Sequence, residues 1–147
     1  MKGSLIHAAA CALDSVGNKI ARDEAPAHIR TGRAGEDTAY FHLRKLGYVM
    51  VARNWRVPQC KGELDLVGWD GDVLCFVEVK TRTSHDVKPA EAAVDDHKRR
   101  ELALMARHFL RRLGGKVPAH RFDIVSIYFP GSTAAEITLF KNVCAVP

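Results

Sequence analysis

Apolar residues recur along the chain with two different spacings, and the change from one to the other delimits the predicted elements. Two stretches repeat apolar positions every three or four residues, which is the spacing of one face of an α-helix. The remaining apolar stretches are short runs of strand length, bounded by glycine, proline and polar turn residues. In chain order, we predict a helix over residues 31–46, strands over 48–55, 64–69 and 73–81, a helix over 89–113, and strands over 121–129 and 136–141. This order predicts an α/β fold with a mixed β-sheet flanked by helices.

Each predicted helix has start and stop signals and an apolar stripe. Thr31 is placed to cap the first helix, and Gly47 to end it. Pro89 suits the first turn of the second helix, and the pair at 114–115, two glycines, ends it. The residues predicted to be buried are Ala39, Leu43 and Leu46 on the first helix, and Leu102, Met105, Ala106, Phe109 and Leu113 on the second.

A β-hairpin is predicted around the Asp70-Gly71 pair, which lies between two apolar runs. If these two residues form the centre of the turn, the opposed pairs are Trp69 with Asp72, Asp65 with Phe76, and Glu63 with Glu78. Side chains alternate along a strand, so Phe76, Glu78 and Lys80 share one face. Glu63 and Asp65 then lie on that same face. The opposite face carries Val73, Cys75, Val77 and Val79 and is predicted to be core.

The acidic face of this hairpin is the candidate for chemistry. Like charges that face each other destabilise a sheet pair by roughly 0.2–1 kcal/mol, and by more where water is excluded. A hard divalent cation such as Mg²⁺ or Mn²⁺ removes this repulsion, since it prefers oxygen ligands and binds through one or two carboxylates plus phosphate. Lys80 could then orient or deprotonate an attacking water, or balance charge in the transition state. A solvated hairpin face with a Glu–Lys pair is the alternative interpretation.

Two further acids are singled out by their position. Glu36 lies three residues before Ala39 and continues the buried stripe of the first helix, where a carboxylate needs a partner. A shared metal would supply that partner, and a solvent-edge glutamate at the helix start is the alternative. Asp123 interrupts the hydrophobic run of the 121–129 strand, which is predicted to be central. We expect Asp123 to pair with Arg121.

Charge is distributed unevenly along the 147 residues, which carry a net charge of +5. Residues 30–61 have seven basic and two acidic side chains, residues 62–87 have two and six, and residues 88–121 have nine and four. An acidic centre between basic flanks suits a cation site surrounded by phosphate contacts, although a modestly basic soluble protein would show similar totals. The charge pattern is therefore compatible with a nucleic-acid partner and does not by itself distinguish the two interpretations.

The remaining features constrain location rather than chemistry. The four cysteines, Cys11, Cys60, Cys75 and Cys144, show no zinc-binding spacing, and free thiols are typical of the cytoplasm. No apolar run approaches 18 residues, so no membrane association is expected. We predict residues 1–29 to be a poorly ordered N-terminal extension and residues 30–147 to form the functional domain. A short signal peptide at the start is the less favoured alternative, because His7 interrupts the apolar run.

The order of acid, Asp65 and then Glu78-x-Lys80 resembles the signature of the PD-(D/E)xK, or restriction-endonuclease-like, superfamily. More closely, the chain resembles the bacterial YraN-type family, which is similar to archaeal Holliday-junction resolvases. The stretches that carry the resemblance are Gly32-Arg33-Ala34-Gly35-Glu36, Ala52-Arg53-Asn54-Trp55-Arg56, Gly62-Glu63-Leu64-Asp65-Leu66, Phe76-Val77-Glu78-Val79-Lys80-Thr81-Arg82, Lys98-Arg99-Arg100 and Arg121-Phe122-Asp123.

The resemblance implies a restriction-endonuclease-like fold and Mg²⁺-dependent (or Mn²⁺-dependent) hydrolysis of DNA, including branched DNA. It implies catalytic roles for Asp65, Glu78, Lys80 and Glu36, and metal binding by Asp65, Glu78, Glu36 and Glu63. The basic residues expected to contact nucleic acid are Arg33, Arg53, Arg56, Arg82, Lys98 and Arg99. A homodimer is expected by analogy with enzymes that cut two strands. The alternatives are a non-catalytic nucleic-acid-binding protein that retains the fold, and a small-molecule enzyme or interaction module.

Overall fold

The computed structural model describes residues 26–58, 60–84, 96–131 and 133–144 of the chain. The chain divides into two units, residues 1–34 and residues 35–147, and the β-sheet lies in the second. The elements are α2 (Ala27–Lys45), β1 (Val49–Trp55), β2 (Leu64–Asp70), β3 (Val73–Arg82), α3 (Asp96–Leu113), β4 (His120–Tyr128) and β5 (Glu136–Cys144). The α/β class predicted from the sequence is confirmed. In the ranges described, no helix is long and apolar enough to cross a membrane.

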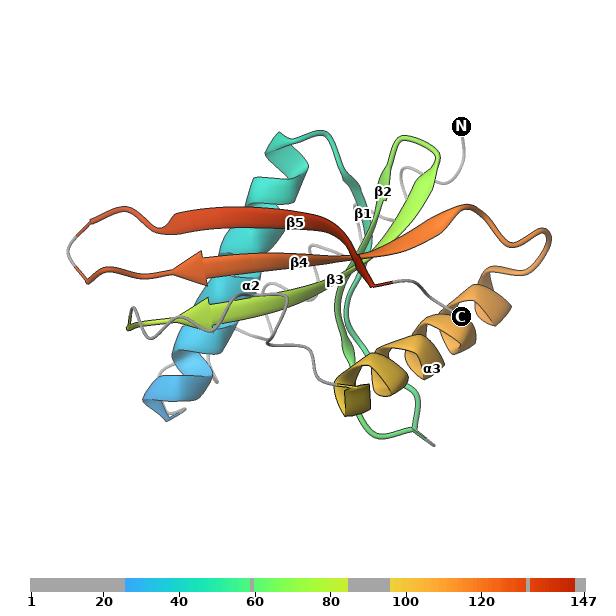
Figure 1. The fold of residues 1–147 in the computed structure, drawn as a ribbon, viewed down its shortest axis with the longest axis horizontal. Coiled ribbons are helices and arrows are strands. Elements are labelled where there is room, and N and C mark those ends of the chain that lie inside the picture. Colours follow the sequence, from blue (N-terminus) through green and yellow to red (C-terminus); the bar gives the residue numbers. More distant parts are fainter. Residues whose placement is uncertain (1–25, 59, 85–95, 132, 145–147) are drawn as a thin grey trace, which may run out of the picture. The chain divides into compact units, whose positions relative to one another are not determined.

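The five strands form one mixed sheet in the order β1-β2-β3-β4-β5 (Figure 1). Neighbouring strands are antiparallel except β3 and β4, which run parallel. A parallel pair needs a crossover connection, and α3 lies within the segment that joins these two strands. The sheet thus places β2 and β3, the strands that carry the acidic motif, between β1 and β4.

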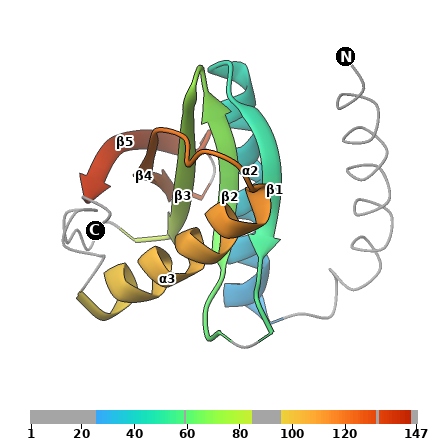
Figure 2. The same ribbon diagram turned by 90° about the vertical axis from the view of Figure 1, so that its right-hand side faces the viewer.

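Two hydrophobic clusters cover the two faces of the sheet, as expected for an α/β fold. On one face, apolar residues of α3 pack against the sheet around Phe76 and Phe122, and Figure 2 shows α3 crossing in front of the strands. On the other face, Ala39 and Leu43 of α2 pack against Cys75 and neighbouring residues of the sheet. Both faces of β3 are therefore buried, including the face that was predicted to carry polar chemistry.

The predicted helices are confirmed as elements but not at their ends. Helix α2 starts at Ala27, so Thr31 does not cap it, and the Thr31 hydroxyl donates instead to the Ala27 carbonyl within the helix, at 2.9 Å. Leu46 is 52% exposed because the helix ends at Lys45, before Gly47 with a φ of 93°. Leu113 on α3 is likewise exposed, so both helices lose the last residue of their predicted stripe. The predicted start of the second helix at residue 89 lies outside the described residues.

The β2–β3 hairpin turns at Gly71-Asp72 rather than at the predicted Asp70-Gly71. Asp70 pairs with Val73, which leaves Gly71 and Asp72 as the two central residues. Gly71 has a φ of 60°, whereas Asp72 is not among the residues with positive φ. This is the pattern of a type II′ turn, in which glycine occupies the first central position, rather than of type I′, which needs positive φ at both.

The predicted register of the hairpin is consequently wrong by two residues. The observed pairs are Trp69 with Leu74, Gly68 with Cys75, Val67 with Phe76, and Leu66 with Val77. They replace the predicted pairs of Trp69 with Asp72, Asp65 with Phe76, and Glu63 with Glu78. Because the side-chain period of a strand is two, a shift of two residues changes the partners but leaves every side chain on its predicted face. The next step of the ladder sets Asp65 opposite Glu78.

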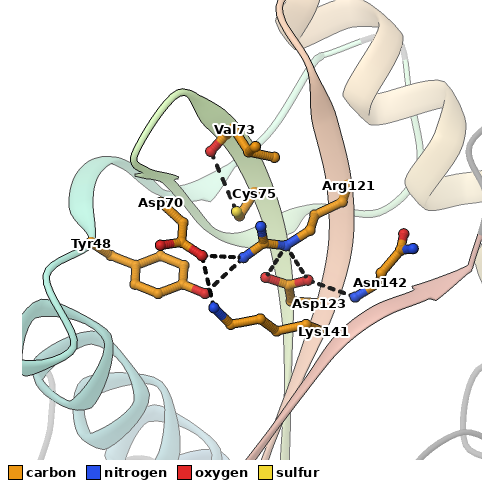
Figure 3. A network of polar contacts seen from close by, with 8 residues as sticks. All are labelled: Tyr48, Asp70, Val73, Cys75, Arg121, Asp123, Lys141 and Asn142. Atoms are coloured by element: carbon orange, nitrogen blue, oxygen red, sulfur yellow. Dashed lines mark hydrogen bonds and ion pairs between the residues drawn. The ribbon is translucent and has the colours of Figure 1, made fainter.

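A buried ion pair confirms the expected partner of Asp123. The carboxylate is completely buried and accepts from Nε of Arg121 at 2.9 and 3.1 Å (Figure 3). It also accepts from the backbone N–H of Asn142 at 2.9 Å. Asn142 has a φ of 55° and lies where the β4–β5 pairing is irregular, so its N–H has left the regular ladder. Asp123 therefore satisfies both a charge and a freed backbone donor.

Arg121 of β4 also links Asp70, at the tip of the β2–β3 hairpin, to Tyr48 (Figure 3). Nη2 of Arg121 donates to Oδ2 of Asp70 at 2.6 Å and to the hydroxyl of Tyr48 at 2.9 Å. Lys141 of β5 donates to the same Asp70 oxygen at 2.8 Å. Hydrogen bonds from Lys141 and Arg121 lower the pKa of Asp70 to about 2. This network is structural, since its carboxylates and cations satisfy one another.

A close approach between α2 and β3 explains the glycine at position 35. A Cβ added to Gly35 would overlap Oγ1 of Thr81 and lie 3.0 Å from its Cβ. We predict that Gly35→Ala lowers the free energy of unfolding by about 1–2 kcal/mol, because overpacking outweighs the better helix propensity of alanine. Urea denaturation would measure this loss, and Thr81→Ala in the same chain should restore part of it. A Gly35→Ala variant as stable as the wild type would show that the helix moves freely away from the strand.

Candidate active site

Two acids lie against each other on adjacent strands of the sheet. Asp65 of β2 is 9% exposed and Glu78 of β3 is 4% exposed. The Asp65 side chain is fixed by the backbone N–H of Val79, which donates to its Oδ2 at 2.7 Å. The hairpin produces this geometry, because a short turn forces two strands of one motif into direct pairing. The structure therefore brings together the two acids on which the sequence prediction chiefly depended.

Burial and repulsion make the ionised form of Asp65 costly. Desolvation, followed by the negative charge of Glu78, raises the pKa of Asp65 to about 7. The hydrogen bond from Val79 and the positive charge of Lys98 oppose this shift but do not cancel it. A buried carboxyl whose ionisation is opposed by burial and by a neighbouring carboxylate is characteristic of metal and catalytic sites.

The two oxygens of Glu78 have different surroundings. Oε1 lies 2.8 Å from Nζ of Lys80 and 3.2 Å from Nζ of Lys98, so two lysines converge on one oxygen. Oε2 is buried and has no hydrogen-bond partner among the described residues. A buried carboxylate oxygen without a partner is expensive, and it points to a ligand that would complete it.

Glu36 approaches the pair from α2. Burial raises its pKa, a hydrogen bond from the Asn54 side chain opposes that shift, and the negative charge of Glu63 adds to it. The charge of Glu36 in turn contributes to the raised pKa of Asp65. Asn54 has a φ of 46° on β1, a conformation that asparagine tolerates better than most residues. The structure thus places Glu36 near the acid pair and holds it through Asn54.

The other predicted site residues have partners of their own. Glu63 accepts from Nε of Arg56 at 2.8 Å and lies 2.6 Å from its Nη2, so its carboxylate is engaged by that arginine. Arg53 pairs with Asp37, and its guanidinium lies 4.8 Å from the centroid of the Tyr40 ring. Nucleic-acid contact by these two arginines remains a prediction.

Three more basic residues were predicted to contact nucleic acid, and they lie on different elements. Arg99 is at the start of α3, 3.7 Å from Asp96. Arg82 ends β3, where its carbonyl accepts from the backbone N–H of Phe129 at 3.0 Å. Arg33 belongs to the first unit of the chain, on the early part of α2.

The donor set fits a hard divalent cation bound by few protein ligands. Within the described ranges, no group of three or more His, Cys, Asp and Glu side chains is arranged to hold a metal ion. Two facing carboxylates, one with an unpartnered oxygen, nevertheless match Mg²⁺ or Mn²⁺, which commonly bind through one or two carboxylates and complete their shell with water and phosphate. Asp65 and Glu78 are the residues that would hold the cation.

Two residues of this site were not recognised from the sequence in their present roles. Contact between Lys98 and nucleic acid remains a prediction, and the structure adds that its ammonium lies 3.2 Å from Oε1 of Glu78. No role for Asn54 was predicted from the sequence. An asparagine within a predicted strand is a weak indication of an irregular backbone, because asparagine tolerates a positive φ. Both contacts join elements that are distant in sequence, so no local pattern revealed them.

A five-stranded mixed sheet with helices on both faces, carrying the acid pair and lysine on a central hairpin, defines a protein of the restriction-endonuclease-like class. The chain belongs to the family described as "Uncharacterised protein family UPF0102", the YraN family, whose model matches residues 35–127. This family is part of the restriction-endonuclease-like superfamily, so the resemblance inferred from the motifs is confirmed.

Curated relatives carry the same family name. The chain is 55% identical over 117 residues to UPF0102 protein Acid345_3985 of Koribacter versatilis, which covers 80% of each chain. It is 50% identical over 105 residues to a UPF0102 protein of Solibacter usitatus, covering 71% of this chain and 80% of the relative. It is 45% identical over 98 residues to UPF0102 protein STH1475 of Symbiobacterium thermophilum, covering 67% and 81%. These names establish the family and state no activity.

Proposed function

We propose that this protein is an endonuclease that uses Mg²⁺ or Mn²⁺ to hydrolyse phosphodiester bonds of DNA. The observation that carries the proposal is the buried pair of Asp65 and Glu78, with an unpartnered Glu78 oxygen and Lys80 beside it. A purely structural pair of acids would be expected to have every buried oxygen satisfied, as the Asp123 carboxylate does in the same sheet.

Each residue of the site has a distinct role in this proposal. When bound, the cation would supply charge stabilisation at the phosphoryl oxygen and lower the pKa of a water ligand. Asp65 and Glu78 hold the cation, and Val79 fixes the Asp65 side chain through its N–H. Lys80, whose Nζ lies 2.8 Å from Glu78, orients the attacking water or donates to the developing negative charge. Glu36, whose negative charge acts on Asp65, would add a further carboxylate ligand for the cation.

A nucleic-acid substrate is favoured because of the charge of the chain around the site, and DNA in particular because of the similarity of the family to Holliday-junction resolvases. The net charge is +5, and the acidic hairpin lies in the sequence between two basic segments. Basic side chains that neutralise phosphates provide affinity regardless of base sequence. The preference for branched DNA rests on the similarity of the family to Holliday-junction resolvases, and a homodimer and a cytoplasmic location belong to the same proposal.

One observation favours the second candidate, a non-catalytic nucleic-acid-binding protein. Lys80 and Lys98 already neutralise Glu78 with two ammonium groups on one oxygen. A site balanced in this way could persist as a structural remnant of a nuclease.

A cleavage and binding assay separates the two candidates. The purified protein is incubated with four-way junction, flap and linear duplex DNA, with Mg²⁺, with Mn²⁺ and with a chelator, and binding is measured on the same DNAs in parallel. We expect strand cleavage that requires the metal and is greatest on the junction. Tight binding without cleavage in any metal would favour the second candidate, and the absence of both would contradict the two together.

A further inference from the structure

We propose that Lys98 is a positioning residue of the site: its ammonium is the resident counter-ion of Glu78, which an incoming divalent cation displaces, so that cation binding is coupled to the start of α3. This inference rests on the proposed function, because it assigns Lys98 a role toward the same cation. It differs from a phosphate-contact role, in which Lys98 would face the nucleic acid rather than the acid pair.

The first observation is the geometry of the lysine. Lys98 lies in the first turn of α3, and its Nζ is 3.2 Å from Oε1 of Glu78 on β3. Its side chain is 27% exposed, whereas the Glu78 side chain is 5% exposed. A long side chain that reaches from the surface of a helix to a buried carboxylate loses conformational entropy. The electrostatic attraction between the ammonium and the carboxylate must offset this loss.

The second observation is the balance of charge. When both are ionised, Asp65 and Glu78 contribute two negative charges, and Lys80 and Lys98 contribute two positive charges. Both ammonium groups lie on the same oxygen of Glu78, so an added divalent cation would bring excess positive charge to that oxygen.

The third observation is that the two lysines do not occupy equivalent positions. Lys80 is two residues from Glu78 on the same strand, so its ammonium stays near the acid whatever the helix does. Lys98 comes from a separate element and reaches the site only while the first turn of α3 is in place. A divalent cation bound at Glu78 would repel both ammonium groups. Because Lys98 is the less constrained of the two, this repulsion moves Lys98 rather than Lys80.

Divalent-cation affinity provides a test that does not depend on activity. Mn²⁺ alone is titrated calorimetrically into the wild type, Lys98→Met, Lys98→Arg and Arg100→Met. Lys98→Met removes the competing charge and should bind Mn²⁺ about tenfold more tightly. Lys98→Arg retains the charge and should stay near the wild type. Arg100→Met removes an exposed charge two residues away on the same helix and should also stay near the wild type.

The outcomes distinguish this inference from the proposed function. If the wild type and a folded Lys98→Met variant bind Mn²⁺ equally, or the variant binds more weakly, the counter-ion role is wrong while the cation site survives. If neither the wild type nor Lys98→Met binds Mn²⁺, both the proposed cation site and the counter-ion role of Lys98 are wrong.

A measurement on the wild type alone covers the case in which Lys98→Met does not fold. Amide hydrogen exchange is followed at residues 98–101 with and without saturating Mn²⁺. We expect faster exchange with Mn²⁺, because the first turn of α3 loses its tether to Glu78. Unchanged or slower exchange in the Mn²⁺-bound protein would contradict the coupling.

Discussion

Replacing Lys80 by methionine is expected to slow metal-dependent cleavage of DNA by about 10²–10⁴-fold, the range for loss of a positioned proton-transfer group. Methionine keeps most of the length and apolar stem of the side chain but removes the ammonium that lies 2.8 Å from Glu78. Single-turnover rates on a four-way junction at saturating Mg²⁺ measure the chemical step separately from binding. Because the two carboxylates remain, cation affinity should not fall.

Lys141→Met is the matched control for this prediction. Lys141 also pairs with a carboxylate, Asp70, at 2.8 Å, but in the structural network at the other end of the β2 strand. Its loss should cost at most about 1 kcal/mol of stability, as for exposed ion pairs, and leave the cleavage rate within about threefold of the wild type. Equal cleavage by Lys80→Met and the wild type would remove Lys80 from the mechanism.

Asp65→Asn is expected to make the metal-free protein more stable than the wild type at pH 8, by on the order of a few kcal/mol. Burial and the charge of Glu78 raise the pKa of Asp65 from 3.8 to about 7. Below about pH 4 the carboxyl is protonated in both the folded and the unfolded chain. Between pH 4 and 7 only the folded chain holds that proton, so the stability of the wild type falls as pH rises through this window. Asparagine carries no charge and can still accept a hydrogen bond from the Val79 N–H, so the stability of the variant does not fall with pH in this window.

Thermal unfolding from pH 5 to pH 8 in the presence of a chelator measures this difference. The advantage of Asp65→Asn over the wild type should grow across the range and level off near pH 8. Asp70→Asn provides a control of opposite sign. Since hydrogen bonds lower the pKa of Asp70 to about 2, its contribution is present throughout this range, and the variant should be less stable by a pH-independent amount. A constant difference for Asp65→Asn would mean that its carboxylate is not destabilised by the fold.

The site was predictable from the sequence wherever the relevant contacts are local. Asp65, Glu78 and Lys80 lie on one hairpin, so the alternation of side chains along strands was enough to place them on one face. The register was wrong by two because Gly71 occupies the first central position of the turn and not the second, a choice that the Asp70-Gly71-Asp72 sequence leaves open. Because side chains alternate with a period of two along a strand, a register error of two residues left every side chain on its predicted face. The error changed the residue that lies opposite Asp65.

The contacts that were missed join distant parts of the chain. Lys98 reaches Glu78 from α3, and Asn54 reaches Glu36 from β1, and neither pair has a spacing that a sequence pattern could reveal. Helix ends were misjudged for a related reason, since periodicity shows which face is apolar but not where packing stops. Leu46 illustrates this point, because it continues the stripe of α2 and yet lies beyond the last helical residue.

The central claim is that Asp65 and Glu78 bind a divalent cation, and paramagnetic broadening by Mn²⁺ tests it most directly. Mn²⁺ is titrated at substoichiometric amounts into ¹⁵N-labelled protein, with excess Mg²⁺ as competitor in a second series. If the two acids bind the cation, the amide signals nearest to Asp65 and Glu78 disappear first, Mg²⁺ restores them, and Glu78→Gln prevents the effect. Broadening centred on another part of the protein, or none at these two acids, would contradict it.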